Sequence, residues 1–295
     1  MSVVQRLRDW WSSPWRPPRF LALITVLYLV WSLLPVLVAV IFSFNSGRSR
    51  AVWQGFSLRW YYGDSVRSVW SDTSLHTALT HTLWLGLLAT VVTVPLGVAF
   101  ALGIDRWHGR LPAGASFIML LSFVLPETLM AVALLFLITQ VATPFTPGTT
   151  AQVIGLVTFQ LSYPVVIVRA RLLTIGKQYE EAAVDLGASP VGAVRRVLLP
   201  MLVPAIFAST VLVFADVIDD FVIVRYLSGD ASTEPVSVKI YNTARAAPTP
   251  ALNALASMLL LFSLIAVVVG FLVYRRLTRG ESADTRGIGS FAGEL

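Results

Sequence analysis

The sequence predicts an all-α membrane protein with six transmembrane helices, because of its composition and its long apolar runs. Of 295 residues, 56% are hydrophobic and only 13% are charged, whereas soluble domains carry about a quarter charged residues. Six continuous runs are long enough for a hydrocarbon layer about 30 Å thick, and a membrane β-barrel would instead show alternating segments of about ten residues. The runs cover residues 20–44, 77–104, 113–141, 152–168, 201–227 and 252–274.

The runs divide the chain into three parts. The first run is longer than the roughly 7–15 apolar residues of a signal peptide and ends without a small-residue cleavage site, so we expect it to remain as an anchor. Residues 1–19 are then an N-terminal segment, 20–275 a six-helix transmembrane domain, and 276–295 a tail. The glycine, serine and mixed charges of that tail predict disorder after Arg279.

The basic residues predict the orientation. If both ends lie on one side, that side has 15 lysines and arginines and the other has six, with Arg225 unassigned. The richer side is expected to be cytoplasmic, which places both termini and the loop at about 173–200 there, in a multi-pass protein of the cytoplasmic (inner) membrane. Because these cations flank the spans, we attribute the net charge of +6 to membrane topology and lipid contact. We expect no nucleic-acid partner. The richer side has Arg6, Arg8, Arg16, Arg19, Arg106, Arg110, Arg169, Arg171, Lys177, Arg195, Arg196, Arg275, Arg276, Arg279 and Arg286, and the other has Arg48, Arg50, Arg59, Arg67, Lys239 and Arg245.

The cytoplasmic loop reads EEAAVDLGASPVGAVRRVLLP over residues 180–200 and predicts two short amphipathic helices. Tyr179, one of the two following alanines and Leu186 recur at helical spacing. Gly187 is expected to end this helix in the left-handed conformation. Ser189 and Pro190 suit the N-cap and first position of a second helix.

The second helix has Val191, Val194 and Leu198 on one side, and we expect Pro200 and Pro204 to end it and begin the fifth span. Two apolar stripes in a polar loop need a partner. From physical chemistry alone, a docked protein and the lipid surface are equally good candidates for that partner. The lipid surface would also attract Arg195 and Arg196 of the second helix.

Carboxylates inside the fifth run predict a functional site. Asp216, Asp219 and Asp220 have the i, i+3, i+4 spacing of one helical face, and Glu127 in the third run is a fourth candidate. A charge at the centre of a membrane costs about 2.5–3.5 kcal/mol on insertion scales. We therefore predict a translocation path for an organic cation. The alternatives are a hydrogen-bonding cluster with protonated acids, or a position at the outer end of the span.

Other chemistry is not indicated. There are no cysteines, and His76, His81 and His108 lie on opposite sides of the proposed membrane, so we expect no metal site. No catalytic set is evident, and Gly176-Lys177 lacks both the preceding glycine and the following hydroxyl of a nucleotide-binding loop. We therefore expect no enzyme activity and no cofactor in this chain, so energy must come from another chain.

The spacing of Glu181-Ala182-Ala183, Gly187, Val197 and Leu199-Pro200 resembles the EAA loop of binding-protein-dependent ABC importer permeases, in which isoleucine usually stands at the position of Val197. Stretches such as LPETLMAVALLFL and DVIDDFVI are similar to permease subunits of spermidine/putrescine importers, of the C type. The resemblance implies a type I importer fold and a loop that seats on an ATPase. The implied coupling residues are Glu180, Glu181, Ala182, Ala183, Gly187, Ser189, Pro190, Val197, Leu199 and Pro200.

The resemblance also implies the partners and the substrate. The partners would be a second, similar permease subunit, two ATPase subunits that hold ATP and Mg²⁺, and an extracytoplasmic binding protein; the substrate would be a polyamine. Permeases of this kind also serve iron or phosphonate. Two other readings are an ion-coupled secondary transporter, whose protons the four acids would carry, and a membrane anchor without transport.

Overall fold

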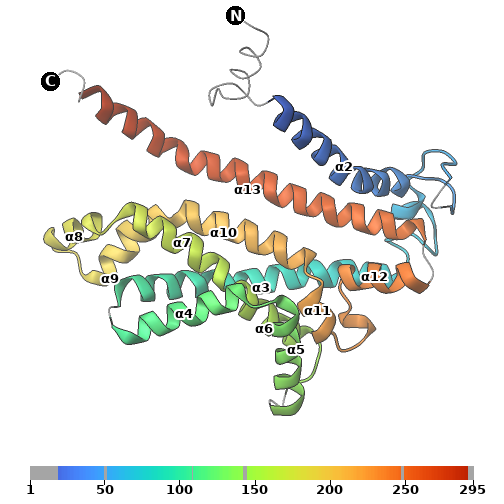
Figure 1. Cartoon of the computed structure of the whole chain (residues 1–295), viewed down its shortest axis with the longest axis horizontal. Coiled ribbons are helices and arrows are strands. Elements are labelled where there is room, and N and C mark those ends of the chain that lie inside the picture. The colour runs from blue at the N-terminus through green and yellow to red at the C-terminus, as the bar shows by residue number, and fades with distance from the viewer. Residues whose placement is uncertain (1–18, 50–51, 108, 142–144, 247–248, 292–295) are drawn as a thin grey trace, which may run out of the picture.

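The computed structural model describes residues 19–49, 52–107, 109–141, 145–246 and 249–291, of which Arg19, Ala246 and 277–291 by their backbone only. This part of the chain is helical and has no strand (Figure 1). The longer helices are α2 (Arg19–Ser43), α3 (Thr73–Arg106), α4 (Arg110–Val124), α5 (Glu127–Phe136), α6 (Thr149–Gln160), α7 (Ser162–Ile175), α8 (Gln178–Asp185), α10 (Leu199–Asp219), α12 (Val236–Ala246) and α13 (Pro250–Phe291). The shorter ones are η1 (Arg59–Gly63), η2 (Leu137–Val141), α9 (Pro190–Ala193), η3 (Val194–Leu198), α11 (Val222–Leu227) and η4 (Ala231–Thr233).

The core is the bundle of α3, α6, α7 and α10, because apolar side chains from all four helices are buried together. Glycines let the helices approach closely: a Cβ at Gly86 would lie 2.5 Å from Ile218, and one at Gly97 would lie 2.4 Å from Pro164. Small residues at such contacts are typical of membrane helices, whose association depends on close packing. The bundle therefore supports α10 along its length.

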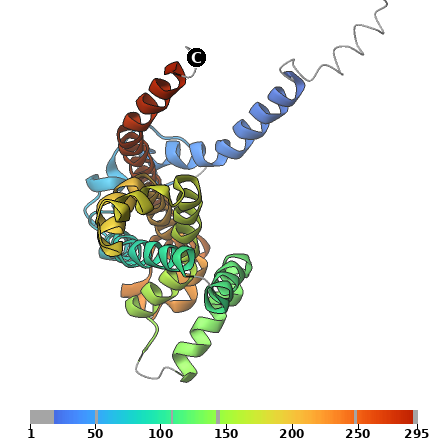
Figure 2. The same cartoon turned by 90° about the vertical axis from the view of Figure 1, so that its left-hand side faces the viewer.

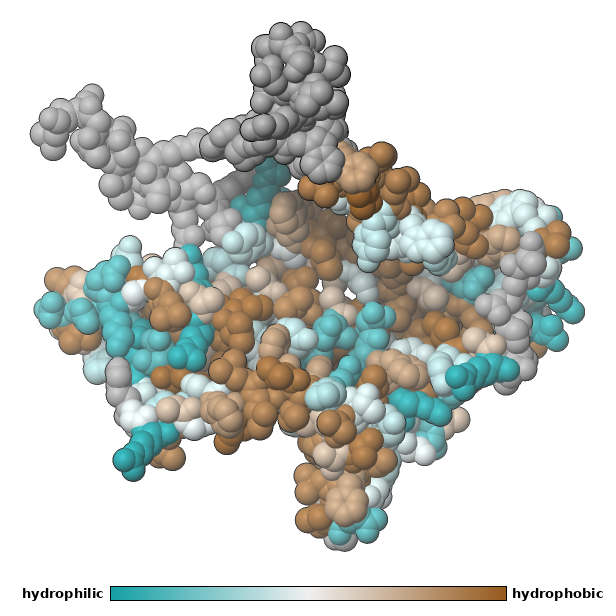
Figure 3. All heavy atoms as spheres, in the orientation of Figure 1, coloured by the Kyte–Doolittle hydropathy of each residue, from teal (hydrophilic) through white to brown (hydrophobic). Residues whose placement is uncertain are grey.

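The outer surface is apolar, as a lipid environment requires. α2 packs against α13 and diverges from the bundle toward its N-terminal end (Figures 1 and 2). Most of its side chains are exposed, Trp31 by 76%, and burial begins only near its C-terminal end. Figure 3 shows hydrophilic residues toward the two ends of the long axis and mostly hydrophobic residues between them, with a smaller hydrophilic group near the centre of this face. This distribution fits a membrane around the middle of the bundle.

The third predicted span is not one helix. α4 and α5 are bent by 108° at Leu125-Pro126, because proline lacks an N–H and disfavours helical geometry in the residue before it; Leu125 is extended at φ −60° and ψ 137°. Five helices within the described residues can each cross a membrane, or six if the bent pair counts as one span. The predicted fold class is confirmed, with this run corrected.

The fifth predicted span begins and ends differently from the prediction. The second loop helix does not end at Pro200, since α9, η3 and α10 form one candidate span, Pro190–Asp219. In the π-helical turn η3, Leu199 N–H bonds to Val194 O five residues back, and this wider turn precedes the proline, which has no N–H to donate. α10 then stops at Asp219, and α11 follows as a separate short helix.

Two further boundaries differ. The run predicted at 152–168 lies within a longer span, Thr149–Ile175, made of α6 and α7. The last helix, α13, continues to Phe291, so the tail predicted to be disordered after Arg279 is helical to that residue. The N-terminal segment before Arg19 lies outside the described residues.

The loop after α2 is a folded unit. The Asn45 side chain is buried and bonds to the backbone of Ser49, Val52 and Gln54 at 3.0, 2.9 and 2.8 Å, and Trp60 Nε1 donates to Asn45 O at 2.7 Å. The hydrogen bond from Arg59 lowers the pKa of Asp64 to about 2. These hydrogen bonds therefore fold the described part of the loop onto itself.

Candidate coupling loop and translocation site

The first helix of the loop ends as the sequence predicts. Gly187 has φ 90°, its N–H bonds to Val184 O at 2.8 Å, and the next N–H, of Ala188, bonds to Ala183 O at 2.9 Å. These two bonds form a Schellman motif, which needs a residue in the left-handed region. Gly187 thus fixes the angle between α8 and the following segment.

The second helix starts at the predicted cap. Ser189 Oγ accepts a hydrogen bond from Gly192 N at 3.1 Å, with Pro190 in the first turn. The apolar stripes remain largely uncovered: α8 buries no residue, and Leu186 and Val191 are exposed by 90% and 77%. Leu198, the stripe residue at the α10 end, is buried, and so is Ala193 of α9. The tip of the loop is therefore an unpartnered surface in this chain.

A cavity of about 640 Å³ lies between α8 and α9. Among its lining residues, Glu180 forms an ion pair with Arg106, the last residue of α3, and Arg106 also contacts Asp105 at 2.5 Å. The sequence identified Glu180 but not its partner. Of the other predicted coupling residues, Glu181, Ala182 and Pro200 are exposed, and Ala183, Val197 and Leu199 are half-buried.

The four predicted carboxylates meet at one cavity of about 320 Å³. The bend at Pro126 brings Glu127, at the start of α5, to the end of α10. The predicted single helical face is wrong, because α10 ends at Asp219 and Asp220 is extended at φ −56° and ψ 134°. Asp220 Oδ1 instead accepts from Val224 N at 3.2 Å. The cavity is lined by Glu127, Phe159, Tyr163, Asp216, Asp219, Asp220, Phe221 and Val222.

A second cavity of about 480 Å³ shares Asp216 and Asp219 with the first and is also lined by Ser237 and Ile240 of α12. Ser237 Oγ donates to Asp220 O at 2.6 Å, which joins α12 to the break after α10. Two of the four carboxylates, Asp216 and Asp219, therefore line both spaces.

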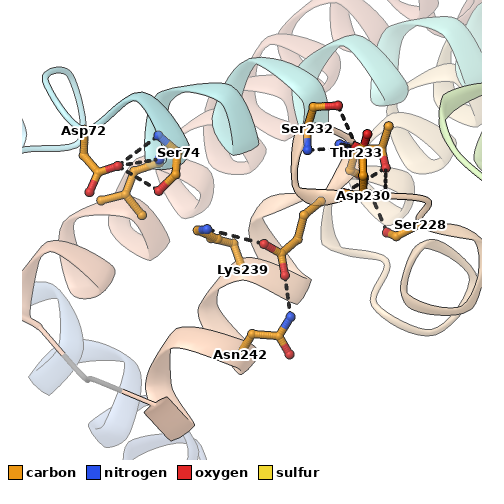
Figure 4. A network of polar contacts seen from close by, with 10 residues as sticks. Asp72, Ser74, Ser228, Asp230, Ser232, Thr233, Lys239 and Asn242 are labelled. Atoms are coloured by element: carbon orange, nitrogen blue, oxygen red, sulfur yellow. Dashed lines mark hydrogen bonds and ion pairs between the residues drawn. The ribbon is translucent and has the colours of Figure 1, made fainter.

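Polar contacts hold α12 and the preceding loop in place (Figure 4). Glu234 accepts from Asn242 and lies 3.4 Å from Lys239 Nζ. Earlier in the loop, hydrogen bonds from Ser232 and Thr233 lower the pKa of Asp230. Contacts with the preceding loop therefore hold in place the part of α12 that lines the second cavity.

Gln160 contacts Asp216 from behind the acidic site, lines neither cavity, and was missed from the sequence. It is the last residue of α6, is fully buried, and donates from Nε2 to Asp216 Oδ2 at 2.5 Å. The signal available in the sequence was an amide side chain inside the fourth apolar run, residues 152–168. Within the described residues, no lysine or arginine forms an ion pair with the four carboxylates.

The histidines lie elsewhere. His81 contacts Gln152 Oε1 at 2.9 Å, His76 lies against Trp70, and His108 is outside the described residues. Among the described residues, no group of three or more His, Cys, Asp or Glu side chains is placed to hold a metal ion.

A bundle of membrane helices with a helix–glycine–helix loop at one end and carboxylates at an internal break defines a transport subunit. The chain belongs to the family described as binding-protein-dependent transport system inner membrane component, whose model matches residues 93–282. It is therefore a multi-pass inner-membrane component, as the sequence predicts.

Two relatives match most of the chain. The spermidine/putrescine transport system permease protein PotC of Escherichia coli (strain K12) is 31% identical over 256 residues, covering 86% of this chain and 93% of the relative. The putrescine transport system permease protein PotI of the same strain is 32% identical over 283 residues, covering 94% and 95%.

Solved structures share the fold. A chain of a bacterial ABC transporter involved in the import of the acidic polysaccharide alginate superposes with a TM-score of 0.75 at 15% identity, covering 92% of this chain and 97% of that chain. A chain of the MetNI methionine ABC transporter gives 0.57 at 18% identity, covering 69% and 94%. The fold is that of ABC importer permeases.

Proposed function

We propose that this chain is one of two membrane subunits of an ATP-driven importer and that its substrate is a polyamine such as spermidine or putrescine. Its partners are a second, similar permease subunit, two ATPase subunits and an extracytoplasmic binding protein. The ATPase subunits bind ATP and Mg²⁺. This chain contributes the translocation path and the helices that transmit motion from the ATPase to it.

The observation that carries this proposal is the continuous stretch from the loop to the acidic cavity. α9, η3 and α10 run without a break from Pro190 to Asp219, a distance of about 45 Å at 1.5 Å per residue. A displacement of the loop tip by an ATPase therefore moves the helix end that carries Asp216 and Asp219. In this mechanism, ATP closes the ATPase pair, the loop transmits the motion, and the path alternates between its two openings.

The substrate class follows from the charges. Four carboxyl groups line one cavity, and those that are ionised repel one another strongly where water is scarce. A cation with several ammonium groups relieves this repulsion along the whole length of the two adjoining cavities. The names of the relatives at 31% and 32% identity support a polyamine over iron or phosphonate.

The orientation completes the proposal. The coupling loop faces the cytoplasm, as the distribution of basic residues favours. The C-terminal end of α13 lies toward the same end of the molecule as α8 and α9 (Figure 1), which supports a cytoplasmic C-terminus. The N-terminus is proposed to lie on that side as well.

Purification tests the class. The chain is tagged and co-expressed with the untagged candidate subunits of its transport system, extracted in mild detergent and purified. We expect an ATPase subunit and a second permease to be recovered, and a Gly187→Val variant to recover less ATPase at equal membrane insertion. Recovery of this chain alone, with uptake in vesicles that collapses with the proton gradient, would contradict the proposal in favour of an ion-coupled transporter.

A further inference from the structure

Three aromatic side chains line the same cavity as the four carboxyl groups. Phe159 is in the last turn of α6, Tyr163 is in the first turn of α7, and Phe221 lies at the break between α10 and α11. All three side chains are half-buried. The wall of this cavity therefore combines acidic groups with aromatic surface.

The carboxyl groups do not converge as the ligands of a metal ion do. Among the described residues, no three His, Cys, Asp or Glu side chains are placed to hold one, although four acids line this cavity. Mg²⁺ gives up its water reluctantly and needs near-ideal octahedral geometry. Carboxylates spread around a cavity therefore attract a hydrated inorganic cation without binding it closely.

The aromatic rings add a preference for organic cations. An ammonium group within about 6 Å of a ring centre is attracted by the face of the ring. The methylene chain between two ammonium groups is stabilised when it leaves water for an apolar wall. A metal ion that keeps its water shell gains neither contact, so the rings favour a diamine over a metal ion of the same charge.

A cation already lies on the ring that supports Phe221. The rings of Phe221 and Tyr241, of α12, pack with their centroids 5.0 Å apart, and the Arg245 guanidinium lies 4.3 Å from the centroid of Tyr241. Within the described residues, Arg245 forms no ion pair with a carboxylate. Contact between a cation and an aromatic ring is therefore already present beside the cavity.

We propose that Phe159, Tyr163 and Phe221 form an aromatic wall that determines specificity, because it makes the acidic cavity bind an organic dication in preference to an inorganic dication. The carboxyl groups attract any cation, and the rings discriminate. Tyr163 is the most informative of the three, because phenylalanine can replace it with the ring retained. The inference rests on the proposed function, whose acidic cavity it uses.

Equilibrium dialysis of labelled putrescine against the purified complex of two permease and two ATPase subunits tests the aromatic wall. The binding protein is omitted so that its own site does not contribute, and Mg²⁺ is the competing inorganic dication. For Tyr163→Leu we expect the Kd of putrescine to rise about fivefold, the factor to which one contact between a cation and a ring corresponds. The inhibition constant of Mg²⁺ should stay the same, and Tyr163→Phe should bind both cations as the wild type does.

Three further variants separate the rings from the charges. Asp216→Asn removes a carboxylate of the same cavity and should weaken both cations. Phe117→Leu removes an exposed ring of α4 that lines neither acidic cavity and should change neither constant. Phe159→Leu repeats the test on α6 and should act like Tyr163→Leu, so the result does not depend on the assembly of one variant.

The outcomes separate the aromatic wall from the proposed function. If the wild-type complex, with its binding protein and ATP, imports no putrescine, the proposed substrate is wrong. If it imports putrescine but binds none in dialysis, or if the leucine variants of the wall keep the wild-type Kd or weaken both cations by the same factor, the aromatic wall is wrong. The aromatic wall is likewise wrong if Tyr163→Phe loses as much as Tyr163→Leu, or if Tyr163→Leu and Phe159→Leu only reduce assembly.

Discussion

The carboxylate of Glu180, in the first helix of the coupling loop, forms an ion pair with Arg106, the last residue of α3. Both side chains are partly buried, at 14% and 29% exposure. α8 is thereby tied to α3, which packs against α10 along the bundle. Besides the chain connection from α7 to α8, two contacts join the loop to the core: this ion pair through α8 and the continuous helix through α9.

Breaking the ion pair should loosen the first of these two connections. For Arg106→Gln we expect normal membrane insertion and retained basal ATP hydrolysis, with fewer substrate molecules imported per ATP. The direct measurement is the ratio of labelled polyamine uptake to phosphate release in proteoliposomes.

A charge exchange tests the pairing itself. The single variants Arg106→Glu and Glu180→Arg should each lower the ratio of polyamine uptake to phosphate release. The double variant Arg106→Glu, Glu180→Arg should recover part of that loss. Arg110→Gln, a nearby arginine at the start of α4, serves as the control and should leave the ratio unchanged. If the exchange restores nothing and both singles behave like the wild type, the ion pair has no part in coupling.

The effect of replacing Gly187 should depend on how well the new residue adopts a left-handed backbone and not on the size of its side chain. A Cβ at this position meets nothing within 4 Å, but φ is +90°, and a left-handed backbone costs most L-residues about 1–2 kcal/mol. We expect Gly187→Asn to reduce coupled uptake slightly, since asparagine is enriched at positive φ, and Gly187→Val to reduce it severely.

The comparison is made at equal amounts of inserted protein, with substrate-stimulated ATP hydrolysis measured beside uptake. Gly114→Ala is the matched control, because it lies in a helix and its Cβ also meets nothing within 4 Å. Normal uptake and stimulation in Gly187→Val would show that the angle set by the Schellman motif is unimportant.

Single cysteines test the orientation, since the chain has none of its own. Ser189, at the tip of the coupling loop, and Ser232, in η4 at the other end of the bundle, are both exposed. In intact cells an impermeant maleimide should label Ser232→Cys, whereas Ser189→Cys should react only after the membrane is opened. Labelling of both from outside would refute the cytoplasmic loop.

The sequence predicted the number and kind of spans because a membrane requires long apolar runs, which hydropathy reveals directly. It did not predict the breaks. Pro126 bends the chain by 108°, while Pro200 sits in a continuous helix behind a π-helical turn. The same residue type had opposite outcomes, because neighbouring helices and the turn before Pro200 decide whether the missing N–H is tolerated.

The site was predictable where its residues are rare in a membrane. Four acids in apolar runs were conspicuous, and the structure brings all four to one cavity. The partners were not visible: Gln160 meets Asp216 across 56 positions, and Arg106 meets Glu180 across 74. No local pattern specifies such contacts, since they depend on how α6 and α3 pack on the rest of the bundle.

The most direct test of a polyamine path through the acidic cavity is ATP-dependent uptake of labelled spermidine by the reconstituted transporter with Asp219→Asn and Asp220→Asn combined. Asparagine keeps the size and the hydrogen bonding of each side chain, so the comparison isolates charge. We predict that each single variant lowers the rate and that the double variant nearly abolishes it, with the amount of assembled complex and the basal ATP hydrolysis unchanged. Uptake by the double variant at the wild-type rate would contradict a charge-stabilised path in this chain.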